Sequence, residues 1–329
     1  MISLRPDASR ARAIDQRMRE RLADSLVYIF DQAEGRIDLP APAERSAFLD
    51  RLKAGPAPPL AFGAYCDAVL ALGAGQNDVA ESLIRQIVAM PSAQELRIDS
   101  LGDVETDEAA QRIERLVDTD PEQSIRLKAP DPAHAEACEA LVRDALALMR
   151  KGDPDLAAEL DALVRQIVLV DTVELDKGPD LSGASSFMLW GAVLLNARIQ
   201  TDLVDLVGSL AHESGHNVLF GLCADGPLVL NEDLERFASP LRADPRPMDG
   251  IVHAVYVVAR MHQALSAMLR SGVLTEAQAC RARECLVEEE AAYRRGRETV
   301  RQQARLTPLG EEVMAGVDAY MADVMAPAD

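Results

Sequence analysis

The feature that most constrains this chain is a pair of histidines four residues apart, His212 and His216, with Glu213 between them. Residues at this spacing lie on one face of an α-helix, so both imidazoles can reach one metal ion. Glu213 lies about 100° further round the helix, close enough to handle the protons of a metal-bound water without being a ligand. The HExxH pattern therefore predicts a helix that carries two metal ligands and needs a third.

The residues around the motif predict that this helix spans residues 202–221. Asp202 is a favourable N-cap residue, and apolar side chains follow it at helical spacing. A buried helix whose histidines only satisfy backbone carbonyls is the alternative interpretation. The spacing of the two histidines favours the metal site.

The favoured third ligand is His253. It opens an amphipathic helical pattern directly after a turn-rich segment, residues 244–250, so a stiff loop would hold it on an early helical turn. The other two histidines, His134 and His262, are expected to be structural, which is the commoner fate of a lone histidine.

A carboxylate is the rival third ligand. Glu232 follows Asn231 and lies 16 residues after His216, a sequence similar to that of zinc peptidases whose third ligand is a glutamate on a later helix. Asp233 and Glu235 are further candidates. In every case we expect three protein ligands.

Composition excludes several classes of function. The chain has 329 residues, 48% of them hydrophobic, and a net charge of −20, which repels nucleic acid and anionic lipid. It has no apolar run of about 18 residues and no secretion signal, so we expect a cytoplasmic protein without membrane partners. Its five cysteines form no CxxC pair, which makes metal binding by cysteine a poor hypothesis.

Hydrophobic periodicity predicts a predominantly α, α+β protein. Residues 1–130 form a helical region that we expect to recognise substrate, and residues 131–329 form a metal-binding region. The division rests on the proline-rich segment 118–132. The β-branched runs 167–173 and 187–195 predict a small sheet beside the metal helix. Helices are expected at residues 7–30, 43–52, 60–72, 77–90, 133–149, 154–163 and 247–270, with a long one after 275 and a last one from 308.

Several segments resemble one known family. They are SGASSF at 182–187, GAV at 191–193, LAHESGH at 210–216, SPLRADPRP at 239–247, and His253 with Tyr256. Together they are similar to the HExxH-motif proteins found with ribosomally made peptide natural products, over residues 183–260. The DPRP sequence at 244–247 is the most specific part.

The resemblance implies an Fe(II)- and 2-oxoglutarate-dependent peptide β-hydroxylase, a dioxygenase of ribosomal peptide biosynthesis whose metal is bound by His212, His216 and His253. Its substrate would be a peptide, and a separate leader-binding protein is a possible partner. This chain departs from the family at Ser214 and Gly215, where bulky residues are usual. A glycine within a helix costs about 1 kcal/mol relative to alanine, so we expect substrate or a neighbouring strand to approach closely there.

The two candidate metals predict different chemistry. Three ligands on one face of an iron ion leave two positions for 2-oxoglutarate and one for dioxygen. The distal carboxylate of 2-oxoglutarate then needs a guanidinium, for which Arg246 is the first choice and Arg242 and Arg260 are the reserves. The alternative role of Arg246 is to pair with Asp244 in its own loop.

With zinc, the same ligands would make a peptidase. Glu213 would act as general base, and Tyr256 or an arginine would stabilise the oxyanion. In a hydroxylase Glu213 would be less critical for activity, because it would only support a metal-binding side chain or contact the substrate. The third hypothesis is a peptide-binding protein without activity that keeps a vestigial metal site.

Overall fold

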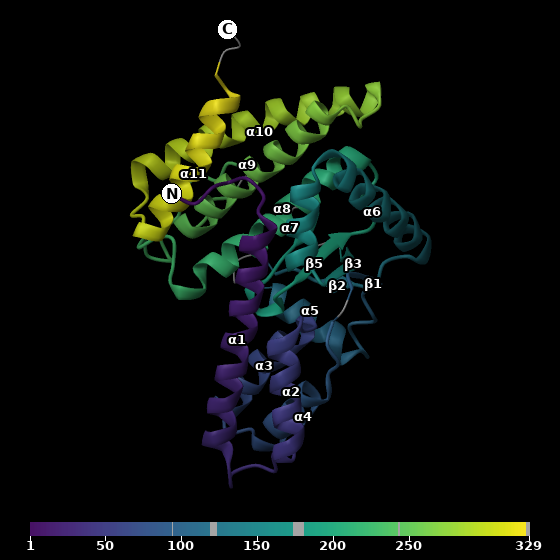
Figure 1. Ribbon diagram of the computed structural model, residues 1–329, viewed down its shortest axis with the longest axis vertical. Helices are drawn as coiled ribbons and strands as arrows, with labels where there is room; N and C mark the ends of the chain where they lie inside the picture. Colours follow the sequence, from purple (N-terminus) through teal and green to yellow (C-terminus); the bar gives the residue numbers. More distant parts are fainter. Residues whose placement is uncertain (94, 119–123, 174–180, 243, 327–329) are drawn as a thin grey trace. The chain divides into compact units, whose positions relative to one another are not determined.

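The computed structural model describes residues 1–93, 95–118, 124–173, 181–242 and 244–326. Within them the chain is 65% helix and 8% strand, with eleven α-helices and a small sheet of five strands (Figure 1). The prediction of a predominantly α, α+β protein is confirmed. None of the described helices combines the length and the apolar character needed to cross a membrane.

The chain forms two compact units that alternate along the sequence. The first, which we call the histidine unit, comprises Met1–Ser9, Ala140–Leu160 and Thr201–Asp329, and the second, the sheet unit, comprises Arg10–Glu139 and Asp161–Gln200. This alternation differs from the single division after residue 130 expected from the sequence, because strands from both sides of that point pair in one sheet. Residues 119–123 of the expected boundary lie outside the described residues.

The sheet is mixed, with the strand order β1-β3-β5-β4. Its strands are β1 (Arg97–Ser100), β2 (Leu127–Lys128), β3 (Gln166–Thr172), β4 (Gly183–Ala184) and β5 (Ala192–Asn196). β1, β3 and β5 run parallel, and in their register Ile167 pairs with both Ile98 and Val193. β4 is antiparallel to β5, and β2 is antiparallel to the end of β3. Both faces of β3 and β5 are buried, which explains their continuous β-branched and aliphatic sequence.

The sequence predicted β3 well and placed the start of the next strand too early. Residues Phe187–Leu189 form a 3₁₀ turn, capped by the Ser186 hydroxyl, which accepts a hydrogen bond from the Met188 amide. Gly191 then adopts a φ of 85°, in the left-handed region that favours glycine, before β5 begins. These two local features delay the strand.

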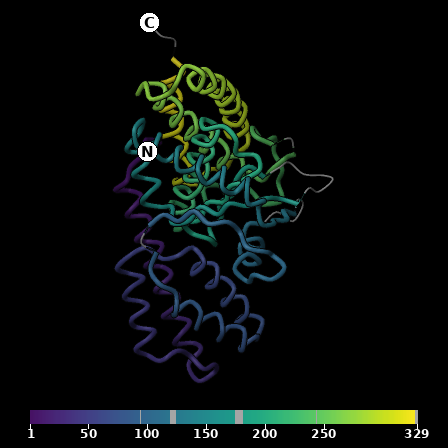
Figure 2. Tube along the Cα trace, turned by 90° about the vertical axis from the view of Figure 1, so that its right-hand side faces the viewer, coloured from purple at the N-terminus to yellow at the C-terminus, as the bar shows by residue number. Residues whose placement is uncertain are grey.

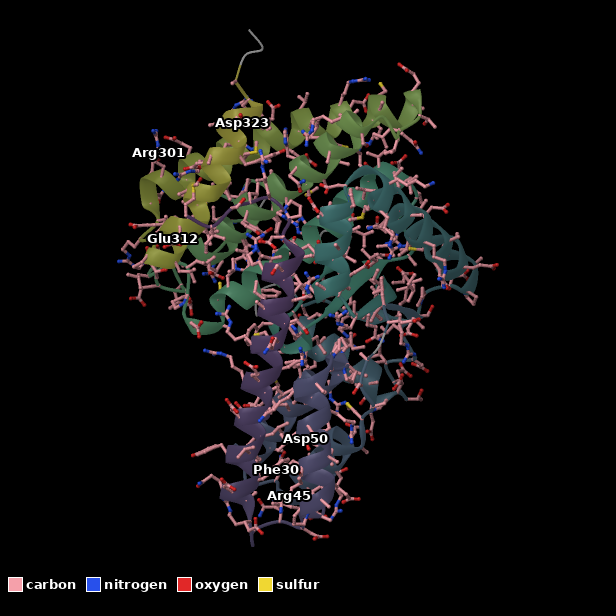
Figure 3. The ribbon with its side chains drawn as sticks, viewed as in Figure 1. Phe30, Arg45, Asp50, Arg301, Glu312 and Asp323 are labelled. Carbon is pink, nitrogen blue, oxygen red and sulfur yellow. The ribbon has the colours of Figure 1, made fainter. Side chains whose placement is uncertain are left out.

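Helices complete the sheet unit. They include α1 (Ala8–Ala33) from Arg10 onward, α2 (Pro42–Ala54), α3 (Pro59–Gly73), α4 (Asn77–Ala89) and α5 (Glu108–Val117), and α2, α3 and α4 lie beside α1 (Figure 1). The apolar stripe of α1 is buried, as its period predicted. Near the end of α1, the Arg45 guanidinium lies 5.4 Å from the centre of the Phe30 ring (Figure 3).

The histidine unit is built around one buried helix. Its main helices are α8 (Leu203–Leu222), α9 (Met248–Ser271), α10 (Glu276–Gln303) and α11 (Pro308–Val324), and parts of α6 (Pro132–Gly152) and α7 (Pro154–Leu163) belong to it. α9 packs against α8, α10 and α11, and the Cα trace shows these helices gathered together (Figure 2). A capping box begins α10, with Thr275 and Gln278 bonded reciprocally.

Gly215 lies where α8 rests on α9. A Cβ atom added there would touch Arg260 Cγ and Val257 Cγ1, each at 3.4 Å, so a side chain longer than alanine would run into α9. The close neighbour expected from the sequence therefore exists within the described residues, and it is the helix α9 rather than a strand.

The Arg260 side chain on which α8 rests carries a fully buried charge. Its guanidinium donates to Glu159 of α7, which is 1% exposed, and to the backbone oxygen of Leu4 at 2.8 Å. Glu159 also accepts from the amide of Asp7 at 2.8 Å. This ion pair joins α7, α9 and the amino-terminal segment within the histidine unit.

We expect Glu159→Ala to lower the free energy of unfolding by about 3–5 kcal/mol, because it leaves the Arg260 charge buried without its partner. Denaturant unfolding followed by circular dichroism measures the change. The control is Glu298→Ala on the surface of α10, where loss of the exposed pair with Arg301 should cost less than about 1 kcal/mol. Equal effects of the two substitutions would contradict this assignment.

A second buried charge site lies on α10. Glu289 is 5% exposed, and within the described residues neither of its carboxylate oxygens has a hydrogen-bond partner. Burial raises the pKa of Glu289 to about 9, and the charge of Glu288 adds to the rise. The folded protein therefore holds a proton at neutral pH that the unfolded chain releases.

This raised pKa predicts how stability depends on pH. Between the ordinary pKa of 4.5 and the folded value of about 9, the unfolded chain binds fewer protons, so the free energy of unfolding falls as pH rises, by up to about 1.4 kcal/mol per pH unit. Glu289→Gln should remove this part of the dependence and raise the melting temperature at pH 8 far more than at pH 4. The exposed Glu276→Gln should leave the dependence of stability on pH unchanged. If the stability of Glu289→Gln varied with pH as the parent's does, the raised pKa of Glu289 would be refuted.

Candidate metal site on the HExxH helix

The motif helix begins where its cap predicted. The Asp202 carboxylate accepts hydrogen bonds from the amides of Val204, at 2.7 Å, and Asp205, at 3.1 Å, and α8 then continues to Leu222. The fixed start and the helical period place His212 and His216 on successive turns of one stripe.

The two motif imidazoles face each other through their Nε2 atoms. Nε2 of His212 lies 3.2 Å from Nε2 of His216, and their ring centroids are 4.9 Å apart at an angle of 69°. Two nitrogens bound to one ion at about 2.0–2.1 Å are separated by roughly 3.0–3.4 Å. The pair therefore fits a shared metal ion.

His253 comes from the second turn of α9 and packs against His216. Its Nδ1 is 3.3 Å from Nδ1 of His216, and the two rings are stacked with centroids 5.5 Å apart at 24°. His216 thus faces His212 with one nitrogen and His253 with the other. Among the described residues no three His, Cys, Asp or Glu side chains surround one position that suits a metal ion. Three-ligand binding requires one of the rings to turn, and the role of His253 as a ligand stays a prediction.

Three further side chains surround the imidazoles, and the sequence did not single them out. The Phe220 ring lies 5.9 Å from the His216 ring and 5.7 Å from the His253 ring. Asp249 Oδ2 is 3.7 Å from His253 Nε2, and Met261 Sδ is 3.4 Å from His212 Nδ1. Phe220 and Asp249 are each four residues from a candidate ligand on the same helix, so the helical spacing could have found them. A carboxylate beside the outer nitrogen of a histidine is a usual support for a metal ligand.

The electrostatics favour neutral imidazoles. Burial lowers the pKa of His212 to about 4 and the pKa of His216 well below its ordinary value, with the neighbouring His212 and His253 adding to the shift on His216. Burial also lowers the pKa of His253, and the charge of Asp249 opposes this. Metal ligands must be unprotonated, so this site has the protonation state that a metal requires.

Glu213 and the carboxylate rivals occupy different environments. Glu213 is 4% exposed, and its Oε1 lies 4.0 Å from Nε2 of His212. Glu232 and Asp233 are exposed, and Glu235 accepts a hydrogen bond from Arg305 at 2.7 Å. The structure places His253, rather than Glu232, against the motif pair.

The two arginines predicted to bind 2-oxoglutarate hold Asp244 between them. Arg242 Nε is 3.2 Å from one carboxylate oxygen of Asp244, and Arg246 Nε is 3.3 Å from the other. Burial opposes ionisation of Asp244, but the hydrogen bond from Arg242 and the charges of both arginines hold its pKa below the usual value. The backbone of Arg246 also pairs with Phe237. Arg246 therefore pairs with Asp244 in its own loop, which is the alternative role predicted for it. Ala243 of the same segment lies outside the described residues.

The remaining candidates lie in the core or on the surface. Tyr256 is 2% exposed in the core. Burial of Arg260 acts to lower its pKa, but the charge of Glu159 and, after it, Tyr256 raise that pKa above its ordinary value. The buried pair with Glu159 excludes Arg260 as a reserve ligand for 2-oxoglutarate. His134 is exposed on α6, and Nδ1 of His262 shares a hydrogen bond of 2.9 Å with the Tyr320 hydroxyl.

No protein-family model matches this sequence, and no curated protein matches it significantly. The family resemblance of residues 183–260 therefore rests on the motif segments themselves.

We expect His212→Ala, His216→Ala and His253→Ala each to weaken metal binding by more than about 100-fold, because each would remove a predicted ligand. Titration of the metal-free protein with Co(II), followed by absorbance, measures the affinity. Glu232→Ala and the exposed His134→Ala should bind as the parent does. Loss of binding in Glu232→Ala with retention in His253→Ala would move the third ligand to the carboxylate.

Proposed function

We propose that this chain is a metal-dependent enzyme whose metal is bound by His212, His216 and His253. The observation that carries the proposal is the pair of Nε2 atoms 3.2 Å apart on α8, with the ring of His253 packed against the pair. The lowered pKa values of the three rings support it, because the neutral form is the one that binds metal.

Our first proposal for the reaction is hydroxylation of a side-chain β-carbon in a ribosomally made peptide, with Fe(II) and 2-oxoglutarate. Bound iron would let dioxygen oxidise 2-oxoglutarate to succinate and carbon dioxide while the second oxygen atom enters a C–H bond of the peptide. The motif segments support this reaction, and so does the placement of a histidine, rather than Glu232, beside the pair. A third imidazole keeps the metal more positive than a carboxylate would.

The chain's own residues have separate tasks in this proposal. The imidazoles hold the metal on α8 and α9, and Phe220 shields two of them from water by covering their rings. Arg246 would bind the distal carboxylate of 2-oxoglutarate, which must then compete with or join Asp244 at the guanidinium. Glu213 would contact ligand or substrate without taking part in every turnover.

A zinc-dependent peptidase is the second candidate, and one observation favours it. The buried carboxylate of Glu213 lies 4.0 Å from Nε2 of His212, close to where a metal-bound water would need a general base. In that reaction Glu213 would take the proton of the attacking water and later give it to the leaving amine. The same residue would then be indispensable.

The two reactions are separated by one set of assays. We expect Fe(II)-loaded protein to convert 2-oxoglutarate to succinate in air, with a higher rate when a substrate peptide is present, and Glu213→Gln to keep most of that activity. Arg246→Met should raise the KM for 2-oxoglutarate by at least about tenfold with little effect on peptide binding, because it removes a charge-assisted contact. The exposed Arg301→Met is the control.

Three other outcomes would replace the proposal. Peptide cleavage by the zinc-loaded protein that is abolished in Glu213→Gln would make it a peptidase. Metal binding without succinate or cleavage would leave a peptide-binding protein with a vestigial site. Equal losses of 2-oxoglutarate and peptide affinity in Arg246→Met would remove Arg246 from its assigned role.

A further inference from the structure

A pocket of about 360 Å³ opens in the histidine unit beside the motif helix. Gly208, four residues before His212 on α8, lines it, and so does Met261 of α9. The Met261 sulfur lies 3.4 Å from Nδ1 of His212, so one side chain contacts both the imidazole and the pocket. The volume lies within the range of small-ligand sites, which is about 300–1,000 Å³.

Most of the pocket wall is apolar. Aliphatic and thioether side chains from α8, α9, α10 and the loop before α9 line it: Val204, Leu241, Val258, Met261, Leu265 and Ala292. Such a wall suits a chain of methylene groups, which gains free energy as it leaves water.

The charged groups of the pocket differ in whether they have hydrogen-bond partners. Arg281 Nε pairs with Asp205 at 2.9 Å, and Arg295 donates to the backbone oxygen of Pro240 at 3.1 Å. Glu289 lies between them in the wall, 5% exposed, with no hydrogen-bond partner for either carboxylate oxygen in the described part of the chain. Burying a carboxyl group without a hydrogen-bond partner costs free energy. A ligand that donates a hydrogen bond to this group would therefore gain the most binding free energy in the pocket.

We propose that this pocket binds an unbranched aliphatic chain that ends in a primary ammonium group, as a lysine side chain does, with the ammonium against Glu289. The methylenes would lie along the apolar wall, and the ammonium would donate to the two oxygens that have no partner. A cation beside Glu289 stabilises its ionised form, which burial otherwise disfavours. Glu288, which also lines the pocket, adds negative charge that favours a cationic end group.

The position of the pocket suggests which molecule brings the ammonium. A basic side chain seated against Glu289 would hold the adjoining peptide backbone near Met261 and hence near His212. The occupant is then the lysine side chain of a peptide substrate, next to the residue that is modified. This assignment rests on the proposed function, whereas binding of the amine itself does not.

Calorimetric titration of the metal-free full-length protein with n-pentylamine tests the pocket without the metal site. We expect n-pentylamine to bind at least about tenfold more tightly than pentan-1-ol, and pentanoate to bind more weakly than either. Glu289→Gln should abolish the preference for the amine, and Glu289→Asp, which keeps the charge, should retain part of it. The matched control is Glu298→Gln on the exposed surface of α10, outside the pocket, which should keep the preference for the amine. Circular dichroism confirms that each variant is folded.

The titration distinguishes a failure of the pocket proposal from a failure of the proposed function. Equal affinity for amine and alcohol, no binding of the amine, or an unchanged preference in Glu289→Gln would overturn the pocket and leave the metal site untouched. Tighter binding of N-pentylguanidine than of n-pentylamine would overturn the ammonium in favour of an arginine-like ligand. If the amine binds as expected but no metal-dependent turnover occurs, the proposed function fails and the amine pocket stands.

Discussion

The packing of the histidine unit depends on the charge that Arg260 carries into its core. The two terminal nitrogens of the guanidinium donate to the Leu4 carbonyl and to Glu159, and the aliphatic stem of Arg260 forms part of the surface on which α8 rests at Gly215. The same helix, α9, holds His253 two turns earlier. The position of the motif helix is thus tied to a buried ion pair formed by residues other than the candidate metal ligands.

Two electrostatic environments meet at Met261. On one side, burial keeps three imidazoles neutral, so their lone pairs are available to a cation. On the other, Glu289 faces a pocket whose arginines are already engaged. Each environment by itself lowers the stability of the folded protein, because it buries polar atoms without strong hydrogen-bond partners. Binding of a cation would reduce both costs, and we propose a metal ion in the first case and an organic ammonium in the second.

Much of the fold was predictable because long amphipathic helices and buried β-branched runs leave clear patterns, as in α1, α8 and β3. The short strand β1 was missed, since four residues with mixed polarity carry little signal. The helix α5 was also missed, although Asp107 caps it and its buried apolar residues recur at helical spacing. For the site, spacing predicted the His212 and His216 pair, and the turn before α9 predicted the approach of His253. Ring orientation, the engagement of Arg246 by Asp244 and the isolation of Glu289 depend on tertiary contacts between distant segments, which local patterns do not record.

The alternation of segments between the two units has a consequence for synthesis on the ribosome. Every residue of the sheet unit has been translated by Gln200, whereas the histidine unit receives most of its helices only from Thr201 onward. The sheet unit can therefore fold first. Until Thr201–Asp329 is synthesised, Met1–Ser9 and Ala140–Leu160 lack the helices against which they pack in the histidine unit. Slow translation beyond Gln200 would prolong the time during which the apolar side chains of these two segments are exposed to chaperones and can aggregate.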